Sequence, residues 1–153
     1  MSQDDAVIDL DISLGYLLKE TSSALRTAME EVLRPLGMSV THYSCLELLA
    51  QRPGLSNSEL ARGAFVTRQS MNVLLQNLER EGLVTRPAEA AIGRVLPAQL
   101  TPRGRRSLAT ASAAVRSVED RMLSGLTASE QAAAQRILRS MVDSLRQGTT
   151  GAG

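Results

Sequence analysis

Apolar residues recur at helical spacing along most of the chain. In the stretch TRQSMNVLLQNLEREGLVTR, which covers residues 67–86, four of them lie at i, i+3, i+4 and i+7: Met71, Leu74, Leu75 and Leu78. This spacing predicts a helix that buries one face. The other face is polar and is rich in Arg, Gln, Asn and Ser, and its first half lacks acidic residues. Such a face suits the edges of DNA bases, although an ordinary solvated face is the alternative.

The segments before this stretch predict three more helices. A long helix is expected over residues 12–33, ended by Pro35 and Gly37, and a short second helix starts after Thr41 as its N-cap. The sequence SNSE, residues 56–59, is a capping box that opens a third helix. Because that helix stops near Gly63 and the stretch described above follows directly, the two form a helix-turn-helix.

After Gly82 the pattern changes to LVTRPAEAAIGRVLPAQLT, in which apolar and polar residues alternate around a small-residue segment. This alternation predicts a two-stranded hairpin. Pro97 restricts its second strand to an edge, because proline cannot donate a ladder hydrogen bond. A hairpin after a helix-turn-helix is a wing, and Arg94 near its tip is placed to reach a DNA minor groove.

Two further helices are expected after the wing. Thr101 caps the first, with Pro102 at its first position, and the sequence TASE at residues 127–130 is a second capping box. The helix over residues 103–123 would be about 30 Å long, and its apolar seam consists of Leu108, Ala111, Val115, Val118 and Met122. We expect this seam to be exposed and to be covered by a second copy in a symmetric homodimer.

These elements predict a mainly α fold with a small β-hairpin wing, a winged helix-turn-helix flanked by N- and C-terminal dimerisation helices. An aromatic content of 2% agrees with a helical protein. We expect a single domain over 1–153. It would comprise a dimerisation region over 10–36 and 102–146, a DNA-binding lobe over 40–101, and a disordered tail over 147–153.

The charges are unevenly distributed along the chain, although the net charge is only +1. Residues 1–61 carry four basic and nine acidic side chains, residues 62–106 carry eight arginines and three glutamates, and residues 107–153 carry five basic and four acidic side chains. The three segments therefore have net charges of −5, +5 and +1. A basic middle segment whose positive charge is all arginine favours nucleic acid as the partner.

The predicted DNA contacts divide by role. Contacts to base edges are expected from the polar face of the recognition helix: Arg68, Gln69, Ser70, Asn72, Val73 and Gln76. Contacts to the phosphate backbone, which position the protein without reading sequence, are expected from Ser56, Ser58, Arg62, Thr67 and Arg86. The wing arginine, Arg94, would enter the minor groove.

Other kinds of site are poorly supported by the sequence. Cys45 is the only cysteine and His42 the only histidine, so neither a disulfide nor a Cys/His zinc site can form within one chain, and we expect no metal or other cofactor. Cys45 lies on the apolar side of its helix, where a core role is expected; the alternative is a redox-sensing thiol, which would need exposure and a lowered pKa. The sequence contains no phosphate-binding glycine loop or nucleophile elbow, so an enzyme is not expected. Without a membrane-spanning run or secretory signal, a cytoplasmic protein is expected.

The order of elements, together with LSNSELA, VTRQSMNVLLQNLEREGLVTR and QLTPRG, resembles the MarR family of bacterial transcription regulators. The resemblance covers nearly the whole chain. It implies a homodimeric repressor that binds a pseudo-palindromic operator in double-stranded DNA and is released by a small aromatic or phenolic effector. The alternative is a winged-helix dimer that serves as a protein-interaction module, which would fit if Arg68 and Arg94 proved buried or paired with acids.

The resemblance also concerns the tip of the wing and a ligand cavity. Members of the family commonly carry an acidic residue two positions before the wing arginine, and Ile92 stands there in this chain. The resemblance also implies a ligand cavity between the dimerisation helices and the DNA-binding lobe. Tyr16, His42 and Tyr43 are candidates for its lining; alternatively, His42 is a surface residue and the tyrosines fill gaps in the core.

Overall fold

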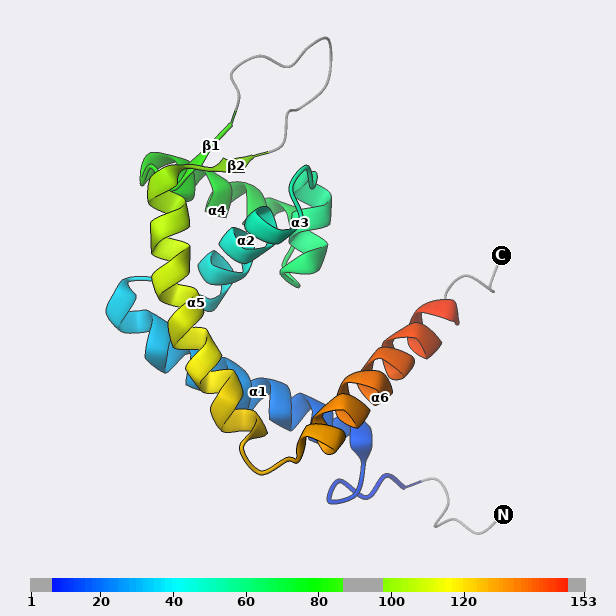
Figure 1. Cartoon of the computed structure of the whole chain (residues 1–153). Helices are drawn as coiled ribbons and strands as arrows, with labels where there is room; N and C mark the ends of the chain where they lie inside the picture. Colours follow the sequence, from blue (N-terminus) through cyan, green and yellow to red (C-terminus); the bar gives the residue numbers. More distant parts are fainter. Residues whose placement is uncertain (1–6, 87–97, 149–153) are drawn as a thin grey trace. The chain divides into compact units, whose positions relative to one another are not determined.

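Helices joined to one small antiparallel sheet make up the computed structural model, which describes residues 7–86 and 98–148 (Figure 1). Contacts divide the chain into two compact units, Met1–Val118 and Glu119–Gly153. The elements in chain order are α1 (Leu14–Leu33), the 3-10 turn η2 (Arg34–Leu36), α2 (Val40–Gln51), α3 (Asn57–Gly63), α4 (Arg68–Arg80), β1 (Val84–Thr85), β2 (Gln99–Leu100), α5 (Pro102–Leu123) and α6 (Ala128–Gln147). The predicted mainly α fold with a small hairpin is confirmed.

Side-chain caps set the starts of the helices, and two of these starts differ from the prediction. Helix α1 begins at Leu14 rather than at residue 12, because Ser13 is its N-cap. Helix α2 is capped by Ser39, whose hydroxyl accepts a hydrogen bond from the His42 backbone N–H at 3.1 Å. The predicted cap, Thr41, therefore lies inside the first turn. A hydroxyl two residues earlier satisfies the free N–H groups.

Both predicted capping boxes are present. In the first, the Ser56 hydroxyl accepts from the Glu59 N–H at 3.2 Å while the Glu59 carboxylate accepts from the Ser56 N–H at 3.1 Å. Thr127 and Glu130 form the second box at the start of α6. These backbone and side-chain hydrogen bonds lower the pKa of Glu59 and of Glu130, because they stabilise the charged carboxylate.

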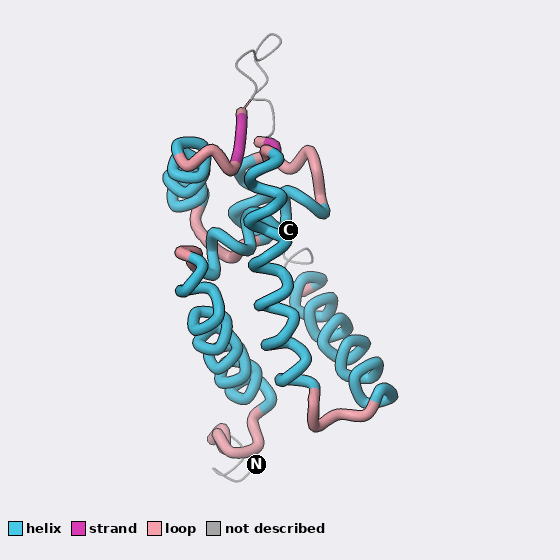
Figure 2. Tube along the Cα trace, turned by 60° about the vertical axis from the view of Figure 1, so that its left-hand side comes forward, coloured by secondary structure: helices cyan, strands magenta, loops and turns pink. Residues whose placement is uncertain are grey.

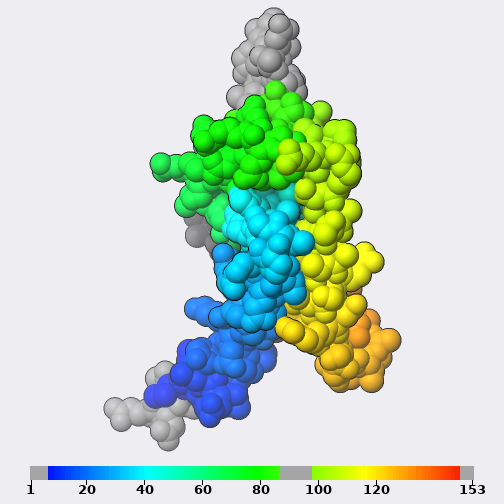
Figure 3. All heavy atoms as spheres, turned by 90° about the vertical axis from the view of Figure 1, so that its left-hand side faces the viewer, coloured from blue at the N-terminus to red at the C-terminus, as the bar shows by residue number. Residues whose placement is uncertain are grey.

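The core of the first unit lies where α2, α3 and α4 meet. Its buried cluster joins Cys45, Leu46 and Leu49 of α2 and two residues of α3 to the apolar stripe of α4. In the space-filling view, α2 lies between the α3–α4 segment and α1, with the start of α5 along one side (Figure 3). The predicted helix-turn-helix therefore rests on a platform made by α2.

The sheet is only two residues long on each strand. Val84 pairs with Leu100 and Thr85 with Gln99 in antiparallel register. Both strands lie at one end of the first unit (Figure 2). The strands at the base of the predicted wing are thus confirmed, whereas Ile92, Arg94 and Pro97 lie outside the described residues.

A close contact fixes α5 to the base of the sheet. The Thr101 hydroxyl donates to the Gly82 carbonyl at 2.6 Å and accepts from the Gly104 N–H at 3.0 Å, while the Thr101 N–H donates to the Leu83 carbonyl at 3.1 Å. Gly104 is buried, and a Cβ there would overlap the Leu83 carbonyl oxygen. The sequence LTPRG is therefore the joint between the wing and α5.

The apolar seam of α5 is not exposed as predicted. Leu108, Ala111 and Val118 are 7%, 0% and 4% exposed within the single chain. Leu108 belongs to the buried cluster that contains α2 and α4. Only Met122, at 43%, is markedly exposed. The expectation was wrong because these three residues are already buried within one chain, Leu108 by packing on the cluster formed by α2 and α4.

A polar contact also joins α2 to α5. The Ser112 hydroxyl donates to the Glu47 carboxylate at 2.8 Å. Partial burial raises the pKa of Glu47, but hydrogen bonds from Gln51, Tyr43 and Ser112 outweigh that effect, so the pKa lies below its usual value. The Glu47 carboxylate therefore joins α2 to α5 most strongly when it is charged.

The second unit contains the end of α5 and α6. The Gln131 amide donates to the carbonyls of Leu123 and Leu126 at 3.5 and 3.2 Å and so joins α6 to the end of α5. Helix α6 has no buried residue. It includes Gln147, which was predicted to begin the disordered tail, and residues 149–153 lie outside the described part.

None of the helices within residues 7–86 and 98–148 combines the length and apolar character that crossing a membrane requires.

Replacing Gly104 by alanine should weaken the joint between the wing and α5. We expect Gly104→Ala to lower the free energy of unfolding by about 2–4 kcal/mol, because the new methyl group would overlap a backbone carbonyl that cannot move independently. Gly125→Ala is the matched control, since nothing lies within 4 Å of a Cβ there. Urea denaturation measures both, and equal stability of the two variants would contradict the assigned contact.

Removing the Glu47 carboxylate should destabilise the protein in a pH-dependent way. We expect Glu47→Ala to cost roughly 1–2 kcal/mol at pH 7, because Ser112 and Tyr43 lose their acceptor. The lowered pKa means that this stabilisation is complete above the unfolded-state pKa and is lost as the pH falls through the folded-state pKa. The gap between variant and wild type should therefore narrow at acidic pH. Glu31→Ala, at an exposed position, is the control, and a gap that is independent of pH would refute the role of the charge.

Candidate nucleic-acid interface

The recognition helix α4 has one buried and one exposed face, as its periodicity predicts. Met71, Leu75 and Leu78 are fully buried and Leu74 is 8% exposed. On the other face the side chains of Arg68, Gln69, Ser70, Val73 and Gln76 are exposed. Packing of the apolar stripe therefore orients the polar face outward, and no described carboxylate lies within ion-pairing distance of Arg68.

Asn72 differs from the other predicted base contacts. It is half-buried, and its side-chain oxygen accepts a hydrogen bond from the Asn57 amide at 2.6 Å. This bond joins the first turn of α3 to α4 and holds the two helices of the motif in register. Sequence reasoning did not single out Asn57, since its pairing with a residue 15 positions later has no local pattern. The Asn72 amide nitrogen keeps its donors.

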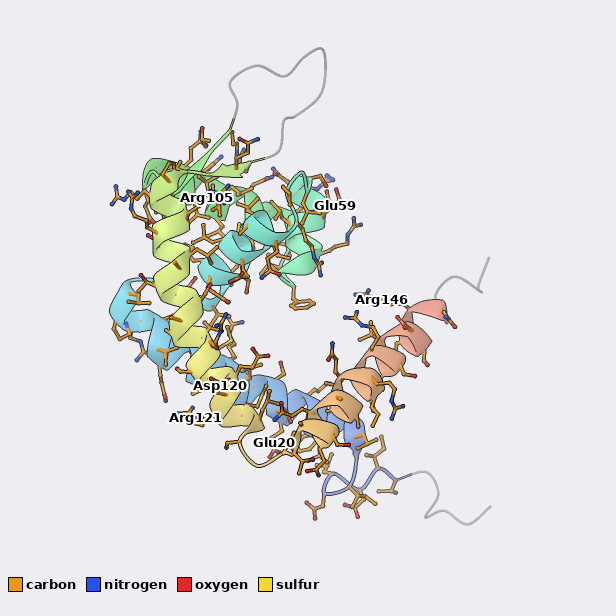
Figure 4. All side chains as sticks on the ribbon, viewed as in Figure 1. Glu20, Glu59, Arg105, Asp120, Arg121 and Arg146 are labelled. Carbon is orange, nitrogen blue, oxygen red and sulfur yellow. The ribbon has the colours of Figure 1, made fainter. Side chains whose placement is uncertain are left out.

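Two of the three hydroxyl groups predicted to contact phosphates, those of Ser56 and Thr67, are already part of helix caps. The Thr67 hydroxyl accepts from the Ser70 N–H at 3.0 Å and donates to the Ser70 hydroxyl at 2.9 Å. Ser56 belongs to the capping box with Glu59, and Ser58 is half-buried. Arg62, in the last turn of α3, is exposed. Glu59 on α3 lies well apart from Arg105, on the first turns of α5 (Figure 4).

Arg86 is less accessible than the other predicted phosphate contacts. Its side chain is 27% exposed, and its Nε lies 4.0 Å from the Glu79 carboxylate. The Nε and Nη2 atoms are buried and have no hydrogen-bond partner among the described residues. The sequence does not predict this burial, because a strand of only two residues has no pattern from which the exposure of the next residue follows.

The candidate effector residues do not share one pocket. His42 lines a cavity of about 550 Å³ between the end of η2, the end of α4 and the first turns of α5, together with Met38, Leu78 and Arg103. Tyr16 lies in a separate pocket along α1. Tyr43 hydrogen-bonds to the Glu47 side chain. His42 is therefore the one of the three that lines the larger cavity.

Cys45 is a core residue, as predicted. Its side chain is fully buried within the cluster formed by α2, α3 and α4. Burial raises the pKa of the Cys45 thiol to about 12, because the apolar surroundings penalise the thiolate.

Comparison with known proteins shows which protein family has this arrangement. The model of the MarR family matches residues 36–95. The HTH-type transcriptional repressor Rv2887 of Mycobacterium tuberculosis is 46% identical over 131 residues, which cover 86% of this chain and 94% of the relative. The chain belongs to the MarR family.

Solved structures agree with membership in the MarR family. The structure of Rv2887 in complex with DNA has a TM-score of 0.68 at 41% identity and covers 84% of this chain and 97% of that one. Its complex with salicylic acid has a TM-score of 0.71 at 46% identity, covering 84% and 96%. These relatives are regulators, so the prediction that the chain is not an enzyme is confirmed.

The buried thiol should be unreactive while the protein is folded. With a pKa near 12, only about one thiol in 10,000 is ionised at pH 8, and the buried sulfur is inaccessible to a reagent. We expect Ellman's reagent to modify Cys45 at least 100-fold more slowly than a free thiol under native conditions. The same protein in guanidinium chloride should release one equivalent rapidly. Fast native modification would show that the thiol is accessible.

Proposed function

We propose that this protein is a homodimeric transcriptional repressor that binds a pseudo-palindromic site in double-stranded DNA and is released by a small aromatic ligand. The observation that carries this proposal is the exposed face of α4, where an arginine and amides project from a helix whose opposite face is buried. Such groups recognise base edges in a major groove. The similar repressor Rv2887 has been solved with DNA.

The contacts to DNA divide between reading and positioning. Arg68 forks onto guanine, Gln69 or Gln76 pairs with adenine, and Val73, at 51% exposure, touches a thymine methyl group. Asn72 contributes its remaining amide donors, and Ser70 its hydroxyl. Arg62, Thr67, Ser56 and Ser58 contact the phosphates, and Arg94 enters the minor groove. Arg86, whose side chain is 27% exposed, contacts a phosphate through the exposed part of its side chain.

Apolar residues on the terminal helices support dimerisation. On α1, Leu14, Leu17 and Leu18 are 63%, 40% and 41% exposed. On α6, Ile137 and Leu145 are 43% and 78% exposed. A second copy of the chain covers these faces, and the resulting two-fold symmetry sets the half-sites of the operator about 10 base pairs apart.

The cavity beside His42 is the candidate effector site. At about 550 Å³ it can hold a molecule with one aromatic ring. It is lined by apolar Met38, Leu78 and Leu83 and by Arg80, Glu81 and Arg103. Two cations against one carboxylate leave the lining net positive, which suits an aromatic acid. The complex of Rv2887 with salicylic acid supports this ligand class.

The alternative function, a protein-interaction module, requires the DNA-reading arginines to be buried or neutralised. Arg68 is exposed and is not paired with a described carboxylate, so this half of the requirement is not met. Arg94 lies outside the described residues. The repressor acts on the bacterial chromosome, and we place it in the cytoplasm.

Two substitutions test the division of roles. We expect Arg94→Ala to weaken binding to all duplexes alike and to lower the slope of log affinity against log salt by about 1, because one phosphate or groove contact is lost. We expect Gln69→Ala to relax preference at one base position and to leave the slope unchanged. Fluorescence anisotropy titrations over a range of salt concentrations measure both quantities.

Arg116→Ala, which removes an exposed charge from α5, is the matched control and should bind like the wild type. An unchanged slope for Arg94→Ala would refute the wing contact. Failure of the wild-type dimer to bind any promoter fragment at low salt would refute the proposed function.

A further inference from the structure

Phe65 occupies the turn between α3 and α4 in an unfavourable way. Its φ is +60°, and it is the only non-glycine residue in the described part of the chain with a positive φ. Its side chain is 90% exposed, more than any other large apolar side chain in that part. A left-handed backbone costs a non-glycine residue about 1–2 kcal/mol, and an exposed phenyl ring gains nothing from burial. Glycine or asparagine would serve the fold better.

The turn does not need the phenyl ring for packing. Val66, the next residue, is half-buried against the core and holds the turn in place. The Phe65 N–H donates to the Arg62 carbonyl at 3.3 Å, and the Val66 N–H donates to the Ala61 carbonyl at 3.0 Å. These backbone bonds fix the turn, so the ring is presented to solvent on a rigid support. Such strain is typical of functional positions.

The surroundings of the ring indicate what it contacts. No Asp or Glu occurs in residues 60–78, while Arg62 and Arg68 lie three residues before and three residues after Phe65 in the sequence, and both are exposed. Thr67, the cap of α4, follows two residues later. A segment that exposes an apolar ring, two arginines and a hydroxyl group matches a DNA strand, in which charged phosphates alternate with the apolar carbons of deoxyribose.

We propose that Phe65 packs against deoxyribose carbons of the operator backbone, at the edge of the major groove that α4 enters. This inference rests on the proposed function and adds a contact to the same interface. Because the ring is uncharged and touches sugar, it contributes affinity without sequence preference and without release of counterions. Its rigid turn lets it bind at a low cost in conformational entropy.

Removing the ring separates this role from a structural one. We expect Phe65→Gly to weaken binding to operator and to unrelated duplexes alike by about 5- to 10-fold, with an unchanged salt slope. Arg62→Ala should instead lower the slope by about 1. The unfolding midpoint of Phe65→Gly should be no lower than that of the wild type, because glycine relieves the left-handed backbone. Phe65→Tyr should restore the affinity.

Val7→Gly is the matched control, because it removes an apolar side chain of 77% exposure outside the helix-turn-helix. It should bind DNA like the wild type. Unchanged affinity of Phe65→Gly while Arg68→Ala loses binding would overturn the inference and leave the proposed function intact. Conversion of Phe65→Gly to a monomer in sedimentation would also overturn it, because the ring would then contact the partner subunit. If the wild type itself bound no DNA, the proposed function would fail first.

Discussion

Burial of the apolar stripe of α4 against α2 and α3 governs what this molecule presents to its surroundings. Because Met71, Leu75 and Leu78 are fully enclosed, the helix cannot rotate about its axis, and its arginine and amide side chains have one direction in which to project. A rotation of one residue, 100° on a helix, would bring polar groups into the core at a cost of several kcal/mol. Sequence reading by the polar face is therefore a consequence of apolar packing on the opposite face.

Local patterns were enough to predict the order of the elements. The two capping boxes, the stripe of α4 and the Thr101 cap depend on residues three or four apart, and the structure confirms each of them. The start of α2 was misplaced because Ser39 and Thr41 are both good caps and the choice between them depends on where the chain leaves η2. The exposed seam expected on α5 was wrong for a different reason, since periodicity shows that a face is buried but does not show what covers it.

The candidate interface was predicted less completely than the fold. Exposure of Arg68 and Gln69 follows from the helical period alone. The engagement of Asn72 by Asn57 and the partial burial of Arg86 follow from the packing of separate elements, which no local pattern encodes. The same is true of the cavity beside His42, which is lined by residues of four elements, η2, α2, α4 and α5. Phe65 could have been noticed as the only phenylalanine, but its left-handed backbone could not.

The contact between Gly104 and the Leu83 carbonyl determines how the two strands are aligned. The ladder between the two strands is only two residues long, so strand pairing contributes little to its alignment. Alignment is instead imposed at the start of α5. Thr101 donates hydrogen bonds to the Gly82 and Leu83 carbonyls, and position 104 has no space for a side chain. The two strands therefore depend on α5 for their position, and a change in the first turn of that helix would shift both of them together.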